Sequence, residues 1–170
     1  MKINYPEMYI KVYKNKGFCS FLRVISAIAV AVAAASVFLA LIAAWLGDGI
    51  DTAVKLAAVL LIPFILVSLA RRAVNLKRPS EVFDLRALGI DTQGFKRGFS
   101  FPSRHVFSGF LIGTALIMSS APAVGIVVLV LSALLGAARV LLGIHFLRDV
   151  IAGALVGAFS AVAGILIIGV

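Results

Sequence analysis

The feature that most constrains this chain is a series of uncharged apolar runs, each suited to crossing a lipid bilayer. The first run extends from Val24 to Leu46, which corresponds to about 35 Å of α-helix at ~1.5 Å per residue. A helix satisfies its own backbone hydrogen bonds in lipid, where no water is present to do so. The chain is therefore expected to be all-α and to insert into a membrane.

The composition of the chain agrees with membrane insertion. Of its 170 residues, 62% are hydrophobic and 14% are charged, whereas soluble domains have about 45–50% apolar and about 25% charged residues. These fractions exclude a soluble enzyme, a disordered segment and a coiled coil. The first apolar run is also longer than the apolar region of a signal peptide and is followed by further runs, so its cleavage is not expected.

Five membrane-spanning helices are predicted, packed as one polytopic bundle in a single domain that covers residues 1–170. Pro63 is expected to kink the second helix. Glycines recur at four-residue spacing in the third and fifth helices, which allows close helix packing in lipid. The predicted spans are Val24–Leu46, Thr52–Ala70, Val106–Ser119, Ala123–Ala138 and Val150–Val170.

Residues 1–23 differ in kind from the rest of the chain. Tyr5, Tyr9 and Tyr13 are four residues apart, so a helix would align them in one aromatic stripe. Together with the nearby lysines, this pattern is typical of an interfacial helix that lies on the membrane surface. A flexible basic N-terminus is the alternative, because the segment also contains a proline and a glycine that limit any helix to a few turns.

Counting five spans places three polar segments on one face of the membrane: the N-terminus, the Arg71–Arg104 loop and the Arg139–Asp149 connection. The turn at Asp48, the hairpin at 120–122 and the C-terminus fall on the other face. Of the 16 Lys and Arg residues, only Lys55 lies on that second face. Beside a bilayer, a formal charge of +9 indicates anionic lipid or a phosphate-bearing substrate, and no nucleic-acid partner is expected.

Three short motifs on the charge-rich face contain the residues suited to phosphate chemistry. The first comprises Arg71, Arg78 and Pro79. An arginine guanidinium binds phosphate oxygens through a planar fork of donors, and Pro79 is expected to end the helix beside it. Basic residues that anchor a helix end to lipid headgroups are the alternative interpretation.

The second motif, Phe101-Pro102-Ser103-Arg104-His105, lies where the polar loop enters the third span. Ser103 is a natural N-cap, and the N-terminus of a helix favours bound anions. His105 can give or accept a proton near neutral pH. A capped helix start with an interfacial histidine is the alternative interpretation.

The third motif comprises Arg139, His145 and Asp149. His145 and Asp149 are four residues apart, so a helix would place them on one face. There the carboxylate can hold one imidazole nitrogen and leave the other free to act as a nucleophile. A purely structural His–Asp hydrogen bond at a helix start is the alternative. Both histidines of the protein lie in these motifs, on the same predicted face.

In order and spacing, the three motifs resemble the signature of the type 2 phosphatidic acid phosphatase superfamily: Lys-x6-Arg-Pro, then Pro-Ser-Gly-His, then Ser-Arg-x5-His-x3-Asp. The resemblance covers Arg71 to Asp149 and implies a membrane lipid phosphatase that needs neither a metal ion nor another cofactor. It implies that His145 becomes a phosphohistidine, that Asp149 orients it and that His105 protonates the leaving oxygen. The residues that would bind the phosphoryl group are Arg71, Arg78, Ser103, Arg104 and Arg139.

Three positions depart from this family pattern. Arg71 replaces a lysine and keeps the charge. Arg104 replaces a glycine and adds a long cation, which would bind a second phosphate or a headgroup, or crowd the backbone. Ala138 replaces a serine and removes one possible phosphate donor. None of the three alters His105, His145 or Asp149, so activity is expected to be retained.

The resemblance implies a lipid phosphate or diphosphate as substrate, with polyprenyl diphosphate, phosphatidylglycerol phosphate, phosphatidate and lipid A 1-phosphate as candidates. A non-enzymatic lipid-binding or small transport protein is the alternative class. The positive-inside rule places the charge-rich face in the cytoplasm, whereas most bacterial members of the family are thought to work on the outer face. Following the resemblance, we expect a multi-pass protein of a bacterial-type plasma (inner) membrane, with its active site on the outer face. The sequence leaves the oligomeric state open.

Overall fold

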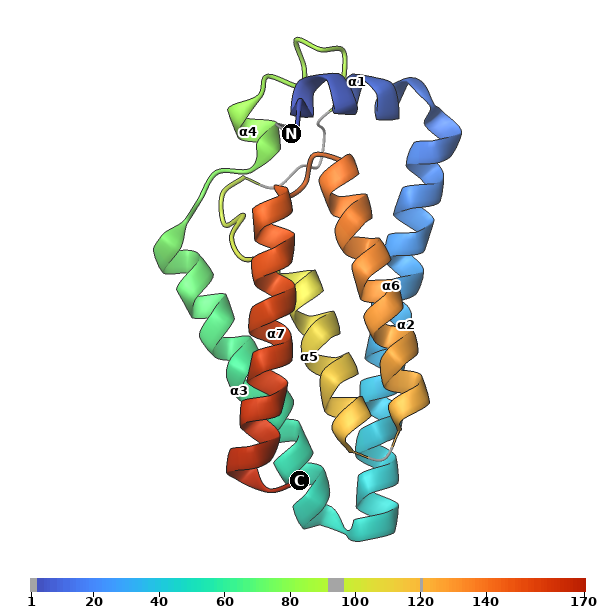
Figure 1. Cartoon of the computed structure of the whole chain (residues 1–170), viewed down its shortest axis with the longest axis vertical. Coiled ribbons are helices and arrows are strands. Elements are labelled where there is room, and N and C mark those ends of the chain that lie inside the picture. Colours follow the sequence, from blue (N-terminus) through green and yellow to red (C-terminus); the bar gives the residue numbers. More distant parts are fainter. Residues whose placement is uncertain (1–2, 92–96, 120) are drawn as a thin grey trace.

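The computed structural model describes residues 3–91, 97–119 and 121–170, and every regular element in these ranges is a helix. This confirms the expected all-α class. Residues 92–96 of the predicted polar loop lie outside the described residues, as does Ser120 of the predicted hairpin. The helices in Figure 1 are α1 (Tyr5–Lys14), α2 (Lys16–Asp48), α3 (Ile50–Val74), α4 (Pro79–Val82), α5 (Arg104–Met118), α6 (Pro122–Leu141) and α7 (Leu147–Ile168).

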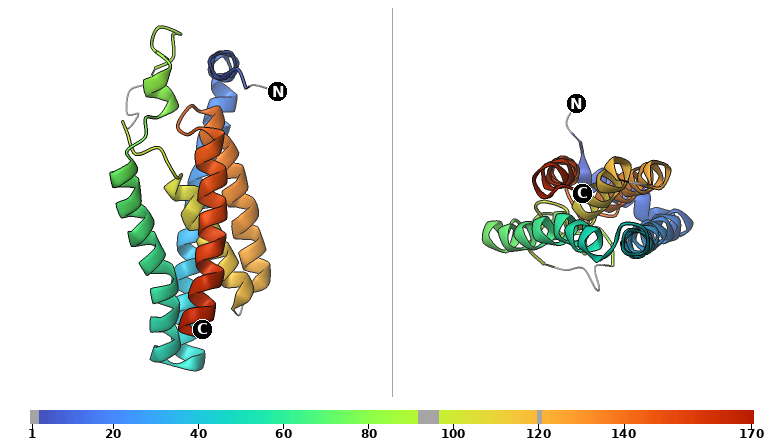
Figure 2. Two further views of the ribbon diagram at one scale, coloured as in Figure 1. Left: turned by 60° about the vertical axis from the view of Figure 1, so that its left-hand side comes forward. Right: turned by 90° about the horizontal axis from the view of Figure 1, so that it is seen from below.

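Helices α2, α3, α5, α6 and α7 run along the long axis of the molecule (Figure 1). In length and composition α2, α3, α6 and α7 can each cross a membrane, whereas α5 has only 15 residues. A helix of that length measures about 22 Å, which is less than the ~30 Å hydrocarbon core. However, α5 lies among α2, α3, α6 and α7 and packs against all four (Figure 2). The polytopic helical bundle is therefore confirmed, with α5 as its central helix.

The outer surface of the bundle is apolar. On α7 alone, Leu155, Phe159 and Leu166 are 67%, 75% and 74% exposed. Soluble proteins rarely expose continuous apolar surface of this kind. The exposed side chains are those expected of a multi-pass membrane protein, in which lipid covers the outer face of each spanning helix.

Glycines let α5 approach its neighbours closely. A Cβ atom added at Gly153 of α7 would lie 2.7 Å from the Ser103 carbonyl oxygen, and one added at Gly157 would overlap the Phe107 carbonyl. Gly109 of α5 is similarly tight against the side chain of Ser132 on α6. The predicted packing through small residues is thus confirmed on both sides of α5.

Helix α2 begins earlier than the first predicted span. The Asn15 side chain accepts a hydrogen bond from the Phe18 backbone N–H at 2.9 Å, which caps the helix at Lys16. The last residues of the interfacial segment predicted over 1–23 therefore belong to α2. Helix α3 is also continuous, and it runs through Pro63.

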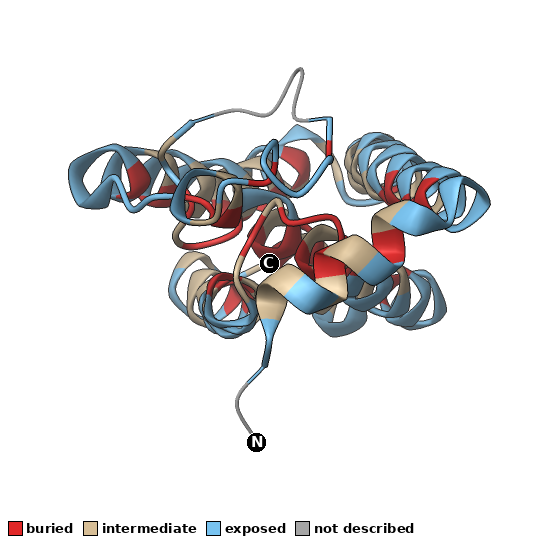
Figure 3. Cartoon of the chain, turned by 90° about the horizontal axis from the view of Figure 1, so that it is seen from above, coloured by how far each residue is buried: buried red, intermediate tan, exposed pale blue. Residues whose placement is uncertain are grey.

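Helix α1 lies across the charge-rich end of the bundle, as Figures 1 and 3 show. The predicted N-terminal helix is confirmed, but its aromatic stripe faces the protein. Tyr9 is fully buried in a cluster with Leu85 and Ile90 of the polar loop. Hydropathy and spacing cannot distinguish tyrosines that contact headgroups from tyrosines that contact protein, which is why the sequence indicated a surface anchor.

The connections between helices divide between two ends of the molecule. Helices α1 and α4 and the α6–α7 connection lie at one end, whereas the turn at Gly49 and the C-terminus lie at the other (Figure 1). At the far end Lys55 pairs with Asp51 at 2.8 Å. All three motifs therefore lie at the same end of the bundle, as the five-span topology requires.

Candidate active site

Direct hydrogen bonds bring the three motifs together at the charge-rich end. The Ser103 N–H donates to the Asp149 carbonyl oxygen at 2.8 Å, which joins the second motif to the third. Arg78 Nη1 donates to the Ile144 carbonyl oxygen at 3.3 Å, which joins the first motif to the third. The residues that the sequence singled out thus converge on one site from α3, α5, α6, α7 and their connections.

The two arginines of the first motif hold the segment that leads into α5. Arg71 is buried and donates to the carbonyl oxygens of Pro102 and Phe99. Arg78 Nε donates to the Gly98 carbonyl oxygen at 2.9 Å. Because a guanidinium has five N–H donors, each arginine keeps N–H groups beyond those that bind these carbonyls.

Helix α3 ends at Val74 with Asn75 as its C-cap, and not at Pro79, where the sequence placed its end. Asn75 adopts a left-handed conformation with φ 40°, and its N–H donates to the Arg71 carbonyl. Pro79 instead begins the short helix α4, whose Glu81 carboxylate accepts a hydrogen bond from the Arg78 N–H at 2.9 Å. Arg71 therefore projects from a helix and Arg78 from the loop after it, and both hold the same segment.

His145 and Asp149 form a buried pair with Ser100. The two residues of the pair are 2% and 0% exposed, and His145 Nδ1 lies 3.6 Å from Asp149 Oδ2. The Ser100 hydroxyl donates to the same carboxylate oxygen at 2.5 Å and lies 3.4 Å from Nδ1. Because Nδ1 faces the carboxylate, Nε2 lies on the opposite side of the ring as the free nitrogen.

The sequence predicted that His145 and Asp149 lie on one face of a helix, and this prediction was wrong. Helix α6 ends at Leu141 and α7 begins at Leu147, so His145 lies in the connecting loop. The Asp149 carboxylate accepts a hydrogen bond from the Phe146 N–H at 3.0 Å, the arrangement by which an acidic side chain in the first turn stabilises a helix start. A helix start and a helix face share the four-residue spacing, so the sequence could not separate them.

The surroundings of His145 favour its neutral form. Burial lowers the pKa of His145 below its ordinary value, and the charges of Arg78 and Arg71 lower it further, while the hydrogen-bonded Asp149 carboxylate opposes these effects. With a lowered pKa the imidazole is neutral at pH 7. A neutral imidazole has the lone pair that nucleophilic attack requires.

Two buried donors beside the pair have no hydrogen-bond partner among the described residues. Ser103 is the N-cap residue of α5, as predicted, but its hydroxyl makes no capping bond and is unpaired. Arg139 Nε is also unpaired. Buried donors are seldom left without an acceptor, because the loss of hydration is costly. Both are therefore available to an anion that enters the site.

Arg104 and His105 line a groove in the side of the bundle that has a volume of about 330 Å³. The Arg104 guanidinium lies 5.7 Å above the ring of Phe64. His105 interacts electrostatically with Arg139 and His145, so it lies where the groove meets the buried pair. The other lining residues are small or apolar: Ala29, Val30, Ala33, Ala34, Ser108, Gly109, Ile112, Ser132 and Leu135.

The site as a whole is suited to binding an anion. Within residues 3–91, 97–119 and 121–170 there is no group of three or more His, Cys, Asp or Glu side chains that could hold a metal ion. Guanidinium groups and unpaired donors surround a neutral imidazole instead. This set of groups can bind a phosphoryl group and present a nucleophile to it.

A comparison with protein families identifies the chain. The sequence model of the PAP2 superfamily matches residues 52–169. The chain belongs to the PAP2 superfamily. It is a multi-pass membrane lipid phosphatase, a hydrolase that acts on lipid phosphates in a membrane. The family that the three motifs indicated is thus confirmed.

A comparison with solved structures supports the fold along almost the whole chain. The crystal structure of Aquifex aeolicus LpxE is similar, with a TM-score of 0.70 and 19% sequence identity. The likeness covers 94% of this chain and 93% of that one, so it includes helices outside the residues matched by the PAP2 superfamily. No curated protein matches the sequence.

Two departures from the PAP2 motifs have a structural explanation. Ala138 is fully buried against Cys19 and Leu22 of α2. A serine hydroxyl at that position would enter an apolar cluster, so the alanine removes no phosphate donor. Arg104 is exposed and stacks on Phe64 at the groove, so its side chain does not crowd the buried His–Asp pair.

Sequence reasoning missed Ser100, which lies outside the PAP2 motifs. It is fully buried and links His145 to Asp149 through its hydroxyl. The signal in the sequence is a small polar residue between Phe99 and Phe101, in a loop that also carries the second motif. That pattern indicates a polar side chain turned inward, but not the group it would contact.

Proposed function

We propose that this PAP2 protein is a metal-independent hydrolase that removes phosphate from a phosphomonoester or diphosphate lipid through a phosphohistidine on His145. The observation that carries the proposal is the buried pair of His145 and Asp149 beside the unpaired donors of Ser103 and Arg139. A nucleophile, the group that orients it and unpaired hydrogen-bond donors that can bind an anion thus occupy one site. These are the components that phosphoryl transfer needs.

In the first half-reaction, Nε2 of His145 attacks phosphorus, and the bond from phosphorus to the leaving oxygen breaks. Asp149 stabilises the positive charge that develops on the imidazole, and His105 donates a proton to the leaving oxygen. In the second half-reaction, His105 accepts a proton from water as that water attacks phosphorus. The phosphorus–nitrogen bond then breaks, which releases phosphate and restores His145.

Positive charge around the site would stabilise the transferred phosphoryl group. Preorganised donors aimed at the equatorial oxygens act strongly in a site that excludes water. The unpaired Ser103 hydroxyl and Arg139 Nε support this role directly, and the spare N–H groups of Arg71 and Arg78 support it by their position. The proposed phosphate-binding residues are Arg71, Arg78, Ser103, Arg104 and Arg139.

The groove supports a lipid as the carrier of the phosphate. Its wall is mostly apolar and its volume of about 330 Å³ is within the range of small-ligand pockets. A headgroup at His105 could therefore react while the first part of the tail lies in the groove. Arg104, held against Phe64, is placed to bind a second anionic group of the substrate. Candidate substrates are polyprenyl diphosphate, phosphatidylglycerol phosphate, phosphatidate and lipid A 1-phosphate.

The test is phosphate release from a panel of these four lipids by purified protein in detergent with a chelator present. We expect the wild type to release phosphate from at least one of them, and expect the rate to fall at least ~10³-fold in His145→Ala and ~10²–10⁴-fold in His105→Ala. Both variants should remain folded, because each replaces a side chain at the charge-rich end and leaves the close packing of the spanning helices unchanged. Undiminished release by His145→Ala would overturn the proposal.

We also propose that the active site faces outward from a bacterial-type plasma membrane. Ala87 is exposed in the polar loop at the charge-rich end, and Cys19, the only cysteine, is buried. Ala87→Cys in a Cys19→Ala background should react with a membrane-impermeant thiol reagent in intact cells. Labelling that requires broken cells would place the site on the cytoplasmic face and contradict this part of the proposal.

A further inference from the structure

The tyrosine stripe of α1 runs along the loop that carries His145, which we define as the catalytic loop, residues 142–146. The Tyr13 hydroxyl donates to the Leu142 carbonyl oxygen at 3.1 Å at the start of this loop. The Leu147 N–H, just after its end, donates to the Tyr5 hydroxyl at 3.4 Å. The two outer tyrosines of one helix therefore bind the backbone on both sides of His145.

Ring contacts fill the space between these two hydrogen bonds. A Cβ atom added at Gly143 would lie 3.5 Å from ring atoms of Tyr9, so this ring covers the loop at Gly143. The Tyr5 ring packs edge-on against Phe146 with centroids 5.3 Å apart. Along α1 the order Tyr5, Tyr9, Tyr13 thus matches positions along the loop in the reverse direction, so the whole stripe is used in holding one segment.

From its inner side, the catalytic loop is held by groups of the proposed active site. Arg78 Nη1 donates to the Ile144 carbonyl oxygen at 3.3 Å. The Arg139 carbonyl oxygen accepts from the N–H groups of Ile144 and His145 at 3.0 and 3.2 Å. Gly143, with φ +70°, gives the loop a turn that residues with a side chain disfavour. The loop therefore lies between the arginines and α1, and beside α1 it also contacts Leu85 and Phe83 of the polar loop.

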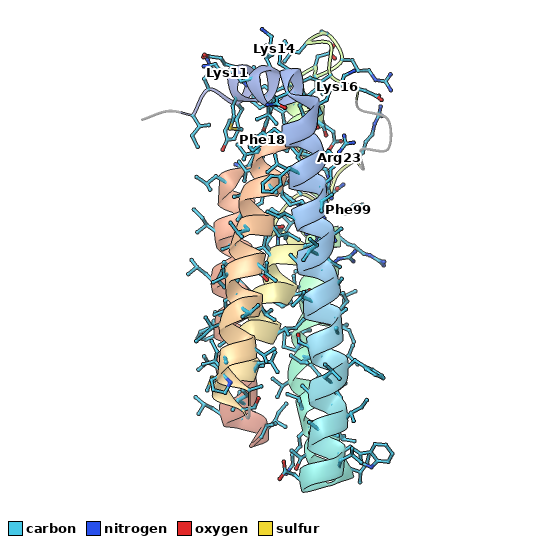
Figure 4. The ribbon with its side chains drawn as sticks, turned by 90° about the vertical axis from the view of Figure 1, so that its right-hand side faces the viewer. Lys11, Lys14, Lys16, Phe18, Arg23 and Phe99 are labelled. Carbon is cyan, nitrogen blue, oxygen red and sulfur yellow. The ribbon has the colours of Figure 1, made fainter. Side chains whose placement is uncertain are left out.

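Helix α1 is itself fixed at both ends and turned outward on its charged side. Its N-cap is Asn4, and Asn15 links it to α2. Lys11 and Lys14 are exposed and point away from the bundle, as Figure 4 shows. The helix lies outside the residues matched by the PAP2 superfamily, 52–169. The contacts of α1 with the catalytic loop are therefore not part of the three motifs.

We propose that Tyr5 and Tyr13 are positioning residues that fix the catalytic loop and hence the imidazole of His145. This inference rests on the proposed function of His145 as nucleophile. A displacement of about 1 Å at a reacting group can cost on the order of 10²-fold in rate. Two hydrogen bonds to the backbone, one at the start of the loop and one just after its end, restrict such displacement.

Release of the loop would also change how His145 titrates. The pKa of His145 is lowered mainly by burial, so a looser loop that admits water should raise the pKa towards its ordinary value of ~6.5. The charged or titratable groups that interact with His145 are Asp149 of α7, Arg71 of α3, Arg78 of the α3–α4 loop and His105 of α5. None of these is changed by a substitution in α1.

The test compares the wild type with Tyr5→Phe/Tyr13→Phe, which removes both hydroxyls and keeps both rings. We expect kcat on a lipid phosphate to fall about tenfold, KM to change less than twofold, and the acid limb of kcat to move to higher pH. NMR titration of the two histidines in detergent, with His145 assigned through His145→Ala, should show a higher His145 pKa in the double variant. Lys14→Gln, on the outward face of the same helix, is the matched control and should leave all of these values unchanged.

The outcomes separate this inference from the proposed function. An unchanged kcat and an unchanged His145 pKa in the double variant would overturn the positioning role, even if His145→Ala is inactive. A lower kcat that follows only a lower melting temperature, with the His145 pKa unchanged, would overturn it as well. Activity retained in His145→Ala would contradict the proposed role of His145 as the nucleophile. The NMR titration would still report whether α1 holds the loop.

Discussion

Helices α5 and α7 are held together by one kind of contact within the bundle and by another kind at the charge-rich end. Within the bundle, Gly157 lets α7 touch the backbone of α5 at Phe107. At the charge-rich end, Ser100 donates to Asp149, and the Ser103 N–H donates to the Asp149 carbonyl. Lipid provides no hydrophobic force between helices, so the bundle depends on close packing, whereas the site depends on individual hydrogen bonds. Substitutions in the bundle should therefore destroy the fold, and those at the site should spare it.

The largest effect is expected from Gly157→Leu, which tests the bundle. A Cβ atom there would overlap the Phe107 carbonyl, and backbone cannot yield as a side chain can, so α7 must separate from α5. We expect loss of monodisperse protein in detergent, measured by size-exclusion chromatography. Phe159→Leu, on the lipid-facing side of the same helix, is the control and should elute as the wild type does. A folded and active Gly157→Leu protein would show that close packing does not decide the fold.

The next effect is expected from Asp149→Asn, which tests the polar end. The amide keeps the shape but cannot stabilise a positive imidazole, and the loss in kcat should be ~10²–10⁴-fold. The variant should elute as a monodisperse protein, in contrast to Gly157→Leu. Asp51→Asn makes the same change at the far end, where the carboxylate is exposed and pairs with Lys55, and should leave kcat unchanged. Equal losses in both variants would remove the distinction between the two ends.

A smaller effect is expected from pH. Burial lowers the pKa of His145, so its neutral, nucleophilic form is present above that pKa and is lost as the pH falls through it. We expect kcat/KM to fall about tenfold per unit on an acid limb whose midpoint lies below ~6.5. Because the Asp149 carboxylate favours the charged form, Asp149→Asn should move this limb to still lower pH. A limb centred above 6.5 would contradict a buried neutral His145.

The smallest effect is expected from Ala33→Phe, which fills the groove from α2 and leaves the polar end unchanged. The larger ring should hinder a lipid tail, and kcat/KM for a long-chain lipid phosphate should fall about threefold to tenfold. A short-chain, water-soluble phosphate ester should be hydrolysed at the wild-type rate, measured as phosphate release under the same conditions. Equal losses for both substrates would show that the groove does not receive the tail.

The bundle could be predicted from the sequence because its determinants are local. Uninterrupted apolar runs indicated the spans. Glycine spacing marked the surface of α5 that meets α6 and the surface of α7 that meets α5. The predicted start of the first span at Val24 was wrong, because hydropathy detects the membrane core and not the helix cap at Asn15. The end of α3 was wrong for a similar reason, since Asn75 ends that helix before Pro79 can.

The site could be predicted only as far as its motifs extended. The convergence of the three motifs could be predicted because the span count placed them on one face of the membrane. The hydrogen bonds between the motifs confirm it. The helix predicted for His145 was wrong, since a loop followed by a helix start has the same four-residue spacing. Ser100 and the tyrosines of α1 act through contacts between distant segments, and spacing within one segment contains no information about such contacts.

The most direct test of the account is to trap the phosphoryl group on the protein. A lipid phosphate is mixed with the wild type, quenched in alkali within one turnover, because phosphohistidine is labile in acid, and digested for mass spectrometry. The account predicts one phosphoryl group on the peptide that contains His145, formed no more slowly than phosphate is released, and none on His145→Ala. Phosphate release with a phosphoryl group on another residue, or with none at any time within the turnover, would contradict it.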